Sequence, residues 1–374
     1  MSPAAATARH LYVHVPFCRR RCSYCDFSIA VRKDVPVEEF STLVGRELGG
    51  RLTASQPVEL DTLYFGGGTP SQLGPEGVAF LVAKLKAAGA RLSVGAEVTL
   101  EANPEDFSAA AANGWRAAGV SRLSIGIQSF HGPVLDWMHR GHSPEGAAEA
   151  VRIARRAGID NISIDLIFGL PERLGRNWAD DLARAIDLGP DHISLYALTV
   201  EPRTPLGRWT ARGAESAPSD DRQADEFMEA HEALEAAGWE HYEVSNYSRP
   251  GRRSRHNSAY WKRVPYIGLG PSAHSFDGLV RRWNTEAFAA WATQVRAGTD
   301  PVAGNEVVSD AQRRAELAYL GLRTDAGADL AAADLDRARA WAREGWAVVD
   351  GQHVRLTAAG WLRLDALAAQ LGGT

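Results

Sequence analysis

The chain alternates short apolar strands with amphipathic helices, and this rhythm recurs six times before residue 240. The predicted strands cover residues 11–15, 62–65, 97–101, 123–128, 162–168 and 192–198. A helical pattern follows each strand; in the first, Phe40, Leu43, Val44 and Leu48 share one face. This alternation predicts an α/β fold with a parallel sheet, helices outside it and right-handed connections. Six units favour an open, partial barrel, and a complete eight-unit TIM barrel is the alternative.

The rhythm ends near residue 240, and the rest of the chain divides in two. We predict a core over residues 1–240, an irregular extension over 241–300 and a small domain over 301–374, with residues 300–306 as a linker. In the last part, helices over 309–322 and 334–344 precede a hairpin that turns at Asp350-Gly351 and a final helix capped by Thr357. That order resembles a winged helix. The part carries 8 Lys and Arg against 10 Asp and Glu, so DNA binding is not expected.

Composition and charge narrow the class of protein. The 374 residues are 45% hydrophobic and 23% charged, as in globular proteins. A formal net charge of −5 argues against a nucleic-acid partner. No apolar run reaches about 18 residues, so we expect no transmembrane segment, and the first residues lack the apolar core of a signal peptide. Three cysteines without an export signal indicate a reducing compartment, and we expect a cytoplasmic protein.

All three cysteines, Cys18, Cys22 and Cys25, lie within eight residues in a C-x3-C-x2-C pattern. A structural zinc site is closed by four ligands, and an ordinary iron–sulfur cluster also takes four thiolates. Three thiolates on a four-iron cube would leave one iron open to a substrate. The arginines at 19–21 would offset the charge of an anionic cluster. A zinc knob or a set of buried thiols is the alternative.

Polar residues stand near the carboxyl ends of the later strands, where ligands bind in open βα architectures. They are the glycine loop 66–69, Glu101, Gln128 and Arg140, with Asp165 inside an apolar run. The glycines let a backbone approach a ligand closely, although a lone Gly-Gly-Gly is more often a flexible turn. The alternative for Glu101 and Arg140 is an ordinary solvent-exposed position on the surface. The alternative for Gln128 is a hydrogen-bonded position in the core. Asp165 needs a partner or a shifted pKa because its neighbours are apolar.

The cysteine pattern after a first strand resembles the radical S-adenosylmethionine (SAM) superfamily, whose cores are commonly (β/α)6 partial barrels. The resemblance implies a [4Fe–4S] cluster on Cys18, Cys22 and Cys25, with SAM chelating the fourth iron. The flanking His-x-Pro-Phe-Cys and Tyr-Cys-Asp-Phe resemble a narrower branch, the oxygen-independent coproporphyrinogen III dehydrogenases and the HemW-type haem chaperones.

The same resemblance implies a set of SAM-contacting positions. They are Tyr12, Gly67, Gly68, Thr69, Glu101, Gln128, Arg140, Asp165 and Ala197. Gly66-Gly67-Gly68-Thr69-Pro70 corresponds to the superfamily's GGE-type motif, whose backbone holds the SAM amino group. Tyr24, between two of the cysteines, is expected to pack on the adenine.

Three features separate the two branches. The dehydrogenases have a fourth cysteine where this chain has Phe27, and a longer N-terminal extension where only eleven residues precede Tyr12. Residues 256–261, His-Asn-Ser-Ala-Tyr-Trp, match the H-N-x-x-Y-W element of the HemW-type chaperones. The match makes His256 the expected haem ligand, with Arg252, Arg253 and Arg255 as partners for the propionates and His274 as a weaker ligand candidate. A basic turn before a packed Tyr-Trp pair is the alternative.

We therefore expect a haem-binding chaperone on a radical SAM scaffold, which passes haem to an apo-haemoprotein such as a respiratory enzyme. The alternative is a SAM-dependent radical oxidase that acts on coproporphyrinogen III or another substrate. A third class is a zinc-bearing adaptor. The family resemblance is compatible with a homodimer.

Overall fold

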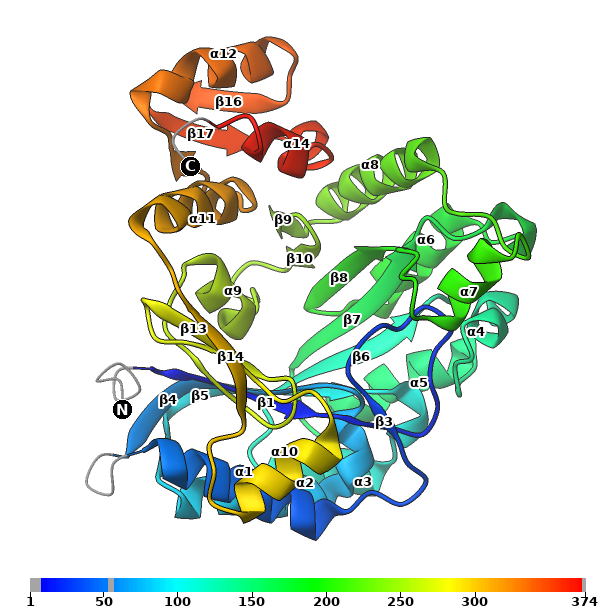
Figure 1. Ribbon diagram of the computed structural model, residues 1–374. Coiled ribbons are helices and arrows are strands. Elements are labelled where there is room, and N and C mark those ends of the chain that lie inside the picture. The colour runs from blue at the N-terminus through cyan, green and yellow to red at the C-terminus, as the bar shows by residue number, and fades with distance from the viewer. Residues whose placement is uncertain (1–7, 53–56, 372–374) are drawn as a thin grey trace.

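A computed structural model describes residues 8–52 and 57–371 of the chain (Figure 1). Six parallel strands, β1 (His10–Val15), β4 (Val58–Gly67), β5 (Ala90–Ala102), β6 (Arg122–Gln128), β7 (Asn161–Phe168) and β8 (His192–Ala197), pair in sequence order. The helices that follow them are α1 (Val37–Arg51), α2 (Gly74–Ala87), α3 (Ala109–Ala117), α5 (Pro144–Arg156), α6 (Trp178–Leu188) and α8 (Asp220–Ala236). The predicted open α/β barrel of six units is confirmed.

The strands are buried on both faces, as parallel strands covered by helices must be. In β7 only Asn161 and Asp165 escape full burial, and Ile162, Ile164 and Leu166 belong to one continuous apolar core. Helix boundaries follow local chemistry: the Ser143 hydroxyl accepts a hydrogen bond from the Gly146 N–H at the start of α5. Gly189, in the left-handed conformation, ends α6.

Shorter elements complete the loops of the barrel. They are β2 (Phe17–Cys18), β3 (Ala30–Val31), α4 (Gly132–Trp137), α7 (Pro205–Ala211) and the 3-10 turns η2 (Pro70–Leu73), η3 (Pro104–Asp106) and η4 (Glu172–Leu174). Strands β2 and β3 pair in parallel on either side of the cysteine loop.

Residues 241–300 are not irregular, and this part of the prediction is wrong. They form β9 (Glu240–Glu243), β10 (Asn246–Ser248), α9 (Arg255–Trp261), β11 (Ile267–Leu269), β12 (His274–Phe276), β13 (Val280–Asn284) and α10 (Phe288–Arg296). Strand β11 joins the sheet beside β1 in parallel, and β10 and β9 extend the other edge in antiparallel fashion. Most of these strands have only three to five residues, too few for a periodic pattern.

The predicted linker is also wrong, because residues 302–307 form β14 (Val302–Val307) of a three-stranded sheet, β12-β13-β14. Its side chains alternate between half-buried and exposed, so no fully buried face produces an apolar alternation in the sequence. The sheet stands over the open side of the barrel beside α9 (Figure 1).

The last part of the chain has the predicted order of helix, helix, hairpin and helix, with one further strand. It contains α11 (Asp310–Leu322), β15 (Ala328–Asp329), η5 (Ala332–Asp334), α12 (Leu335–Arg343), β16 (Ala347–Asp350), β17 (His353–Leu356), α13 (Ala358–Trp361) and α14 (Leu364–Ala368). Ser309 and Gln312 form a capping box at the start of α11. No helix in the described ranges is long and apolar enough to cross a membrane.

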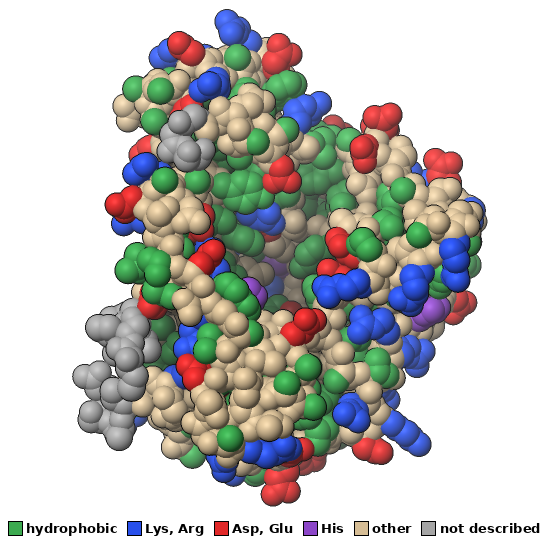
Figure 2. All heavy atoms as spheres, viewed as in Figure 1, with side chains coloured by type: hydrophobic (Ala, Val, Ile, Leu, Met, Phe, Trp, Pro, Cys, Tyr) green, Lys and Arg blue, Asp and Glu red, His purple; other side chains and the backbone are tan. Residues whose placement is uncertain are grey.

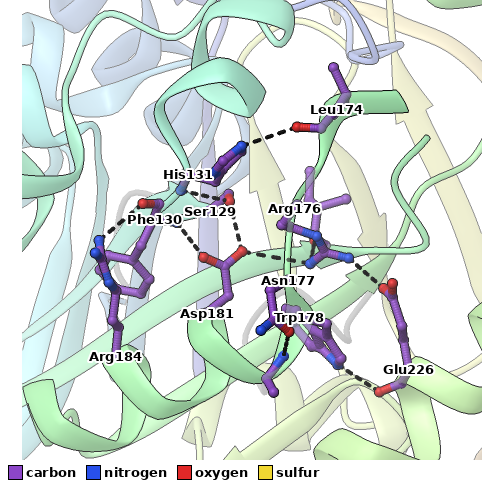
Figure 3. Close-up of polar contacts among 12 residues, drawn as sticks. Ser129, Phe130, His131, Leu174, Arg176, Asn177, Trp178, Asp181, Arg184 and Glu226 are labelled. Carbon is purple, nitrogen blue, oxygen red and sulfur yellow. Dashed lines mark hydrogen bonds and ion pairs between the residues drawn. The ribbon is translucent and has the colours of Figure 1, made fainter. Parts of the chain in front are cut away.

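A buried ionic network fixes the loop after β7 against α6 and α8 (Figure 3). The Arg176 guanidinium lies 3.6 Å from the Asp181 carboxylate and donates to Glu226 over 2.5 Å. Asp181 also accepts hydrogen bonds from the Ser129 hydroxyl and the Phe130 N–H, just beyond β6. The network therefore ties the carboxyl ends of two strands to two helices.

Replacing Arg176 with methionine is expected to lower the free energy of unfolding by about 3–5 kcal/mol, because it leaves the buried Asp181 carboxylate without its cation, while Glu226 keeps only its ion pair with Arg222. The Arg176 side chain is only 1% exposed. Urea unfolding followed by circular dichroism measures the change. The control is Arg152→Met, at an exposed pair with Glu149, where the expected loss is below about 1 kcal/mol. Equal losses in the two variants would contradict the assignment.

Candidate functional site

The cysteine loop lies across the carboxyl ends of the barrel strands and is held from three sides. Cys18 belongs to β2, which pairs with β3. The Ser23 N–H donates to the Met138 carbonyl at the end of α4, and the Ser23 carbonyl accepts from the Leu206 N–H at the start of α7. The three thiols are therefore carried on a loop whose backbone is fixed by distant parts of the chain.

A chain of polar contacts links two of the thiols through residues that follow β4, β5 and α4. The Cys18 Sγ lies 3.3 Å from the Thr69 Oγ1, which accepts a hydrogen bond from the Asn103 amide at 3.4 Å. The Asn103 Oδ1 accepts from the Arg140 Nη2 at 2.7 Å, and the Arg140 Nη1 donates to the Cys22 Sγ at 3.6 Å. Thr69 and Arg140, both predicted site residues, thus contact the cysteines directly.

Burial makes a free thiolate unfavourable at this site. It raises the pKa of the Cys18 thiol to about 12, with the neighbouring cysteines adding to the rise, and it raises the pKa of Cys25. A cationic partner is needed to hold such thiols deprotonated, and a metal cluster provides one. Among the described residues no three His, Cys, Asp or Glu side chains converge as they would around one metal ion. Three thiols on one loop, with the Arg140 guanidinium against Cys22, are the soft donors that an iron–sulfur cluster takes.

The glycine loop packs too closely on its neighbours for any side chain. A Cβ on Gly67, whose φ is +109°, would lie 2.5 Å from the His14 ring, and one on Gly68 would lie 2.7 Å from the Phe17 carbonyl oxygen. The Gly68 and Thr69 N–H groups donate to the Val15 and Phe17 carbonyls. The glycines therefore join β4 to the strand that carries the first cysteine.

Two half-buried carboxyl groups lie in the mouth of the barrel. Glu101 accepts hydrogen bonds from the Tyr64 hydroxyl at 2.8 Å and the Gly67 N–H at 3.1 Å, and burial raises its pKa to about 7. Asp165 accepts from the Ser124 hydroxyl at 3.1 Å, and burial raises its pKa to about 6. The charge of Asp165 adds to the shift at Glu101, so the two groups are near neighbours.

Three more predicted positions lie on strands of the same sheet. Tyr12 stacks on Tyr64 with ring centroids 6.0 Å apart. Gln128 ends β6 at a bulge with φ +71°, and the Gly126 carbonyl before it accepts a hydrogen bond from Arg140 at 2.5 Å. Ala197 ends β8 and is exposed beside Phe168 of β7.

A cavity of about 540 Å³ opens next to Glu101 and Gly67, within the usual size of ligand sites. Figure 2 shows the hollow, with apolar side chains along its walls and histidine in its depth. Its walls come from β1, the loop after the cysteines, the extension and α11. They comprise Tyr12, His14, Phe27, Ser28, Gly67, Glu101, Tyr260, Trp261, Arg263, Tyr266, Ser272, His274, Phe276, Arg281, Glu316 and Leu320.

Comparisons with known proteins agree with this geometry. The profile of the Radical SAM superfamily matches residues 12–182. The "Heme chaperone HemW" of Mycobacterium tuberculosis is 37% identical over 383 residues, which cover 100% of this chain and 97% of that protein. The "Heme chaperone HemW" of Synechocystis is 38% identical over 326 residues, or 84% of this chain and 78% of that protein. The chain belongs to the HemW family of radical SAM proteins.

The solved structure of coproporphyrinogen III oxidase (HemN) from Escherichia coli, described as a radical SAM enzyme, has the same fold as this HemW-family chain. The TM-score is 0.82 over 98% of this chain and 92% of the other, at 22% sequence identity. The likeness thus extends beyond the barrel to the extension and the C-terminal part.

His256 does not present a free nitrogen in this HemW-family structure. Its Nδ1 lies 2.6 Å from the Thr62 hydroxyl and its Nε2 lies 2.8 Å from the Tyr260 hydroxyl. The side chain is buried, with 1% of its surface exposed, and burial lowers its pKa to about 3. Ligation of iron by His256 would break one of these hydrogen bonds, so the geometry does not support its predicted role.

The arginines expected to accompany His256 are also engaged elsewhere. Arg253 pairs with Glu240 and Asp325, and Arg252 lies 3.7 Å from the Asp191 carboxylate. Tyr24 packs in a small apolar cluster with Met138 and Leu206, and its contact with an adenine stays a prediction.

Several residues of the site were not predicted from the HemW-type motifs. Asn103 bridges Thr69 and Arg140, and its position directly after a strand is the signal that identifies it. Arg122, fully buried near Glu101 and Asp165, offers no such signal, because an arginine at the start of a strand usually faces solvent.

Replacing Glu101 with glutamine is expected to change how stability depends on pH. The folded pKa of Glu101 is about 7 against an ordinary 4.5, so between these values the folded chain holds a proton that the unfolded chain releases. Wild-type stability therefore falls as pH rises through this window, by about 3 kcal/mol from this one group. The variant has no such titration. Its free energy of unfolding, measured with urea, should therefore rise relative to that of the wild type by about 3 kcal/mol between pH 4 and pH 8.

Glu172→Gln, at a carboxyl that is 84% exposed, serves as the control and should follow the wild-type profile. A constant difference between Glu101→Gln and wild type across the range would show that Glu101 titrates normally.

Proposed function

We propose that this chain is a haem chaperone built on a radical SAM scaffold, which binds haem and delivers it to apo-haemoproteins such as respiratory enzymes in the cytoplasm. The observation that carries the proposal is the cavity beside Glu101, whose walls combine six aromatic side chains with two arginines and two histidines. Aromatic walls suit a porphyrin face, histidine suits its iron and arginine suits its propionates. The names of the relatives from M. tuberculosis and Synechocystis support the same function.

The residues of the barrel mouth suit the cofactors that the family implies. Cys18, Cys22 and Cys25 would hold a [4Fe–4S] cluster, which when bound offers SAM an iron with an open coordination position. Arg140 orients the Cys22 sulfur and supplies positive charge beside it. Tyr12, Gly67, Gly68, Thr69, Glu101, Gln128, Asp165 and Ala197 surround the place for SAM, where Glu101 can hold a proton or an ammonium group. A homodimer remains part of the proposal by family analogy.

A second candidate is a SAM-dependent radical oxidase acting on coproporphyrinogen III or another substrate. One observation favours it: the cavity includes Gly67 and Glu101, so a bound molecule would reach the expected SAM position. Phe27, where the dehydrogenases are expected to have a fourth cysteine, lines the cavity as an exposed aromatic ring. Phe27 in place of the fourth cysteine favours haem binding over the dehydrogenase reaction.

The function is tested by adding haem, and separately coproporphyrinogen III with SAM and a reductant, to the anaerobically reconstituted protein. Haem binding with transfer to apomyoglobin, and no loss of coproporphyrinogen, is the expected result. Absorption spectra follow the haem, and chromatography follows the porphyrins. Stoichiometric consumption of coproporphyrinogen with release of 5′-deoxyadenosine would instead establish the oxidase.

Replacing Cys22 with alanine is expected to abolish iron and sulfide uptake while haem binding persists, because no cysteine lines the cavity. Iron and sulfide analysis after anaerobic reconstitution measures the first effect, and haem titration the second. Ser23→Ala, in the same loop, is the control and should load normally. A Cys22→Ala protein that retains the full iron content would remove Cys22 from the cluster.

A further inference from the structure

The three-stranded sheet β12-β13-β14 presents one face to the cavity. His274 pairs with Trp283 across β12 and β13, and Phe276 pairs with Arg281. Since alternate residues of a strand face the same side, His274, Phe276 and Arg281 project together, and all three line the cavity. Ser275, between them, faces away and accepts a hydrogen bond from Arg51 of α1. The face toward the cavity thus carries an imidazole, an aromatic ring and a cation.

His274 is the available imidazole of the cavity. Of the two histidines in its walls, His14 is bonded at both ring nitrogens, to the Tyr12 hydroxyl and the Ser28 carbonyl. Within the described residues, His274 has a ring contact with Trp283 at 6.0 Å and no hydrogen bond from either nitrogen. Burial, with a contribution from Arg281, lowers its pKa, which leaves the ring neutral with a free lone pair at neutral pH.

Two arginines stand beside this imidazole and are oriented by one carboxylate. Glu316 of α11 accepts from the Arg263 Nε at 2.6 Å and from the Arg281 Nη2 at 2.8 Å. Arg281 also pairs with Glu306 of β14, and Arg263 stacks over the Phe276 ring at 4.6 Å. A guanidinium has five N–H donors, so both groups keep donors for a further acceptor.

Arg263 has features that a purely structural ion pair does not require. Its side chain is only 9% exposed, yet its Nη2 has no hydrogen-bond partner in the described structure. Its backbone φ of +51° belongs to the end of α9, where the Arg263 and Val264 N–H groups donate to the Tyr260 and Ala259 carbonyls. A buried, unpaired N–H group on a cation is unfavourable, and an anionic group that enters the cavity would relieve it.

We propose that His274 is the axial ligand of haem in this cavity and that Arg263, with Arg281, binds a haem propionate. The assignment rests on the proposed haem-binding function and names its site. One ring nitrogen of His274 replaces water on the ferric iron, with no change in oxidation state. The porphyrin lies among Tyr12, Phe27 and Tyr266, and His256 keeps its hydrogen bonds to Thr62 and Tyr260.

The axial ligand is tested by titrating ferric haem into the full-length protein and its His274→Ala variant. The variant should lose the absorption and electron paramagnetic resonance signature of imidazole-ligated haem, and added imidazole should restore it. His353→Ala is the control, because that histidine lies on β17 and bonds to Asp329 and the Ala326 carbonyl, away from the cavity. A His274→Ala protein with the wild-type spectrum would overturn the assignment.

The propionate contact is tested with Arg263→Gln and two ligands, haem and its dimethyl ester. Loss of a charged hydrogen bond should weaken haem binding about tenfold or more and leave the affinity for the uncharged ester unchanged. Arg282→Gln, which alters an arginine on the opposite face of β13, is the matched control and should bind both ligands normally. Equal weakening for the two ligands would exclude a propionate contact.

The two proposals fail in different ways. If the wild-type protein takes up no haem, the proposed function is wrong. If it takes up haem but both His274→Ala and Arg263→Gln match the wild type, the function stands and this site is wrong.

Discussion

The hydrogen bond from Arg140 to Cys22 completes a path of side-chain contacts between two of the thiols, and the rest of the site depends on it. Through Asn103 and Thr69, that path returns to Cys18, so residues from three separate loops fix two of the three thiols. Arg140 is half-buried and also donates to the Gly126 carbonyl at the bulge of β6. The position of the sulfurs is therefore set by the sheet itself. Backbone hydrogen bonds fix the loop itself, and this cation adds a side-chain contact that orients the Cys22 sulfur.

The same region concentrates buried charge that a stable core would ordinarily avoid. Glu101 and Asp165 share the mouth of the barrel with buried Arg122, and desolvation shifts both carboxyls toward their neutral forms. Such groups are costly without ligands and become useful when a charged ligand arrives. The Arg176 network on the other side of β7 shows the contrast, since each of its ions has its partner in place. The Arg176 network stabilises the scaffold, whereas the charged groups at the mouth of the barrel are suited to binding a ligand.

The barrel could be predicted from the sequence because its strands carry long apolar runs, as in residues 162–168. Asp165 could be singled out because it conflicts with such a run. Strand β14 could not, since no side of it is fully buried, and β11 is only three residues long. Asn103 could be singled out because it directly follows a strand, whereas the contact of Arg263 with Glu316 joins residues far apart in the chain and no local pattern records it. His256 matched a motif, but its surroundings come from Thr62 and Tyr260, and they occupy both nitrogens.

The walls of the cavity come from both ends of the chain: Tyr12 and Phe27 near the start, His274 and Arg281 in the extension, and Glu316 on α11. During synthesis on the ribosome, the thiols and the six parallel strands emerge first, and α11 emerges only after more than three hundred residues. A partly made chain can therefore fold its cysteine loop while the cavity still lacks a wall. The order of translation itself separates formation of the cysteine loop from completion of the cavity.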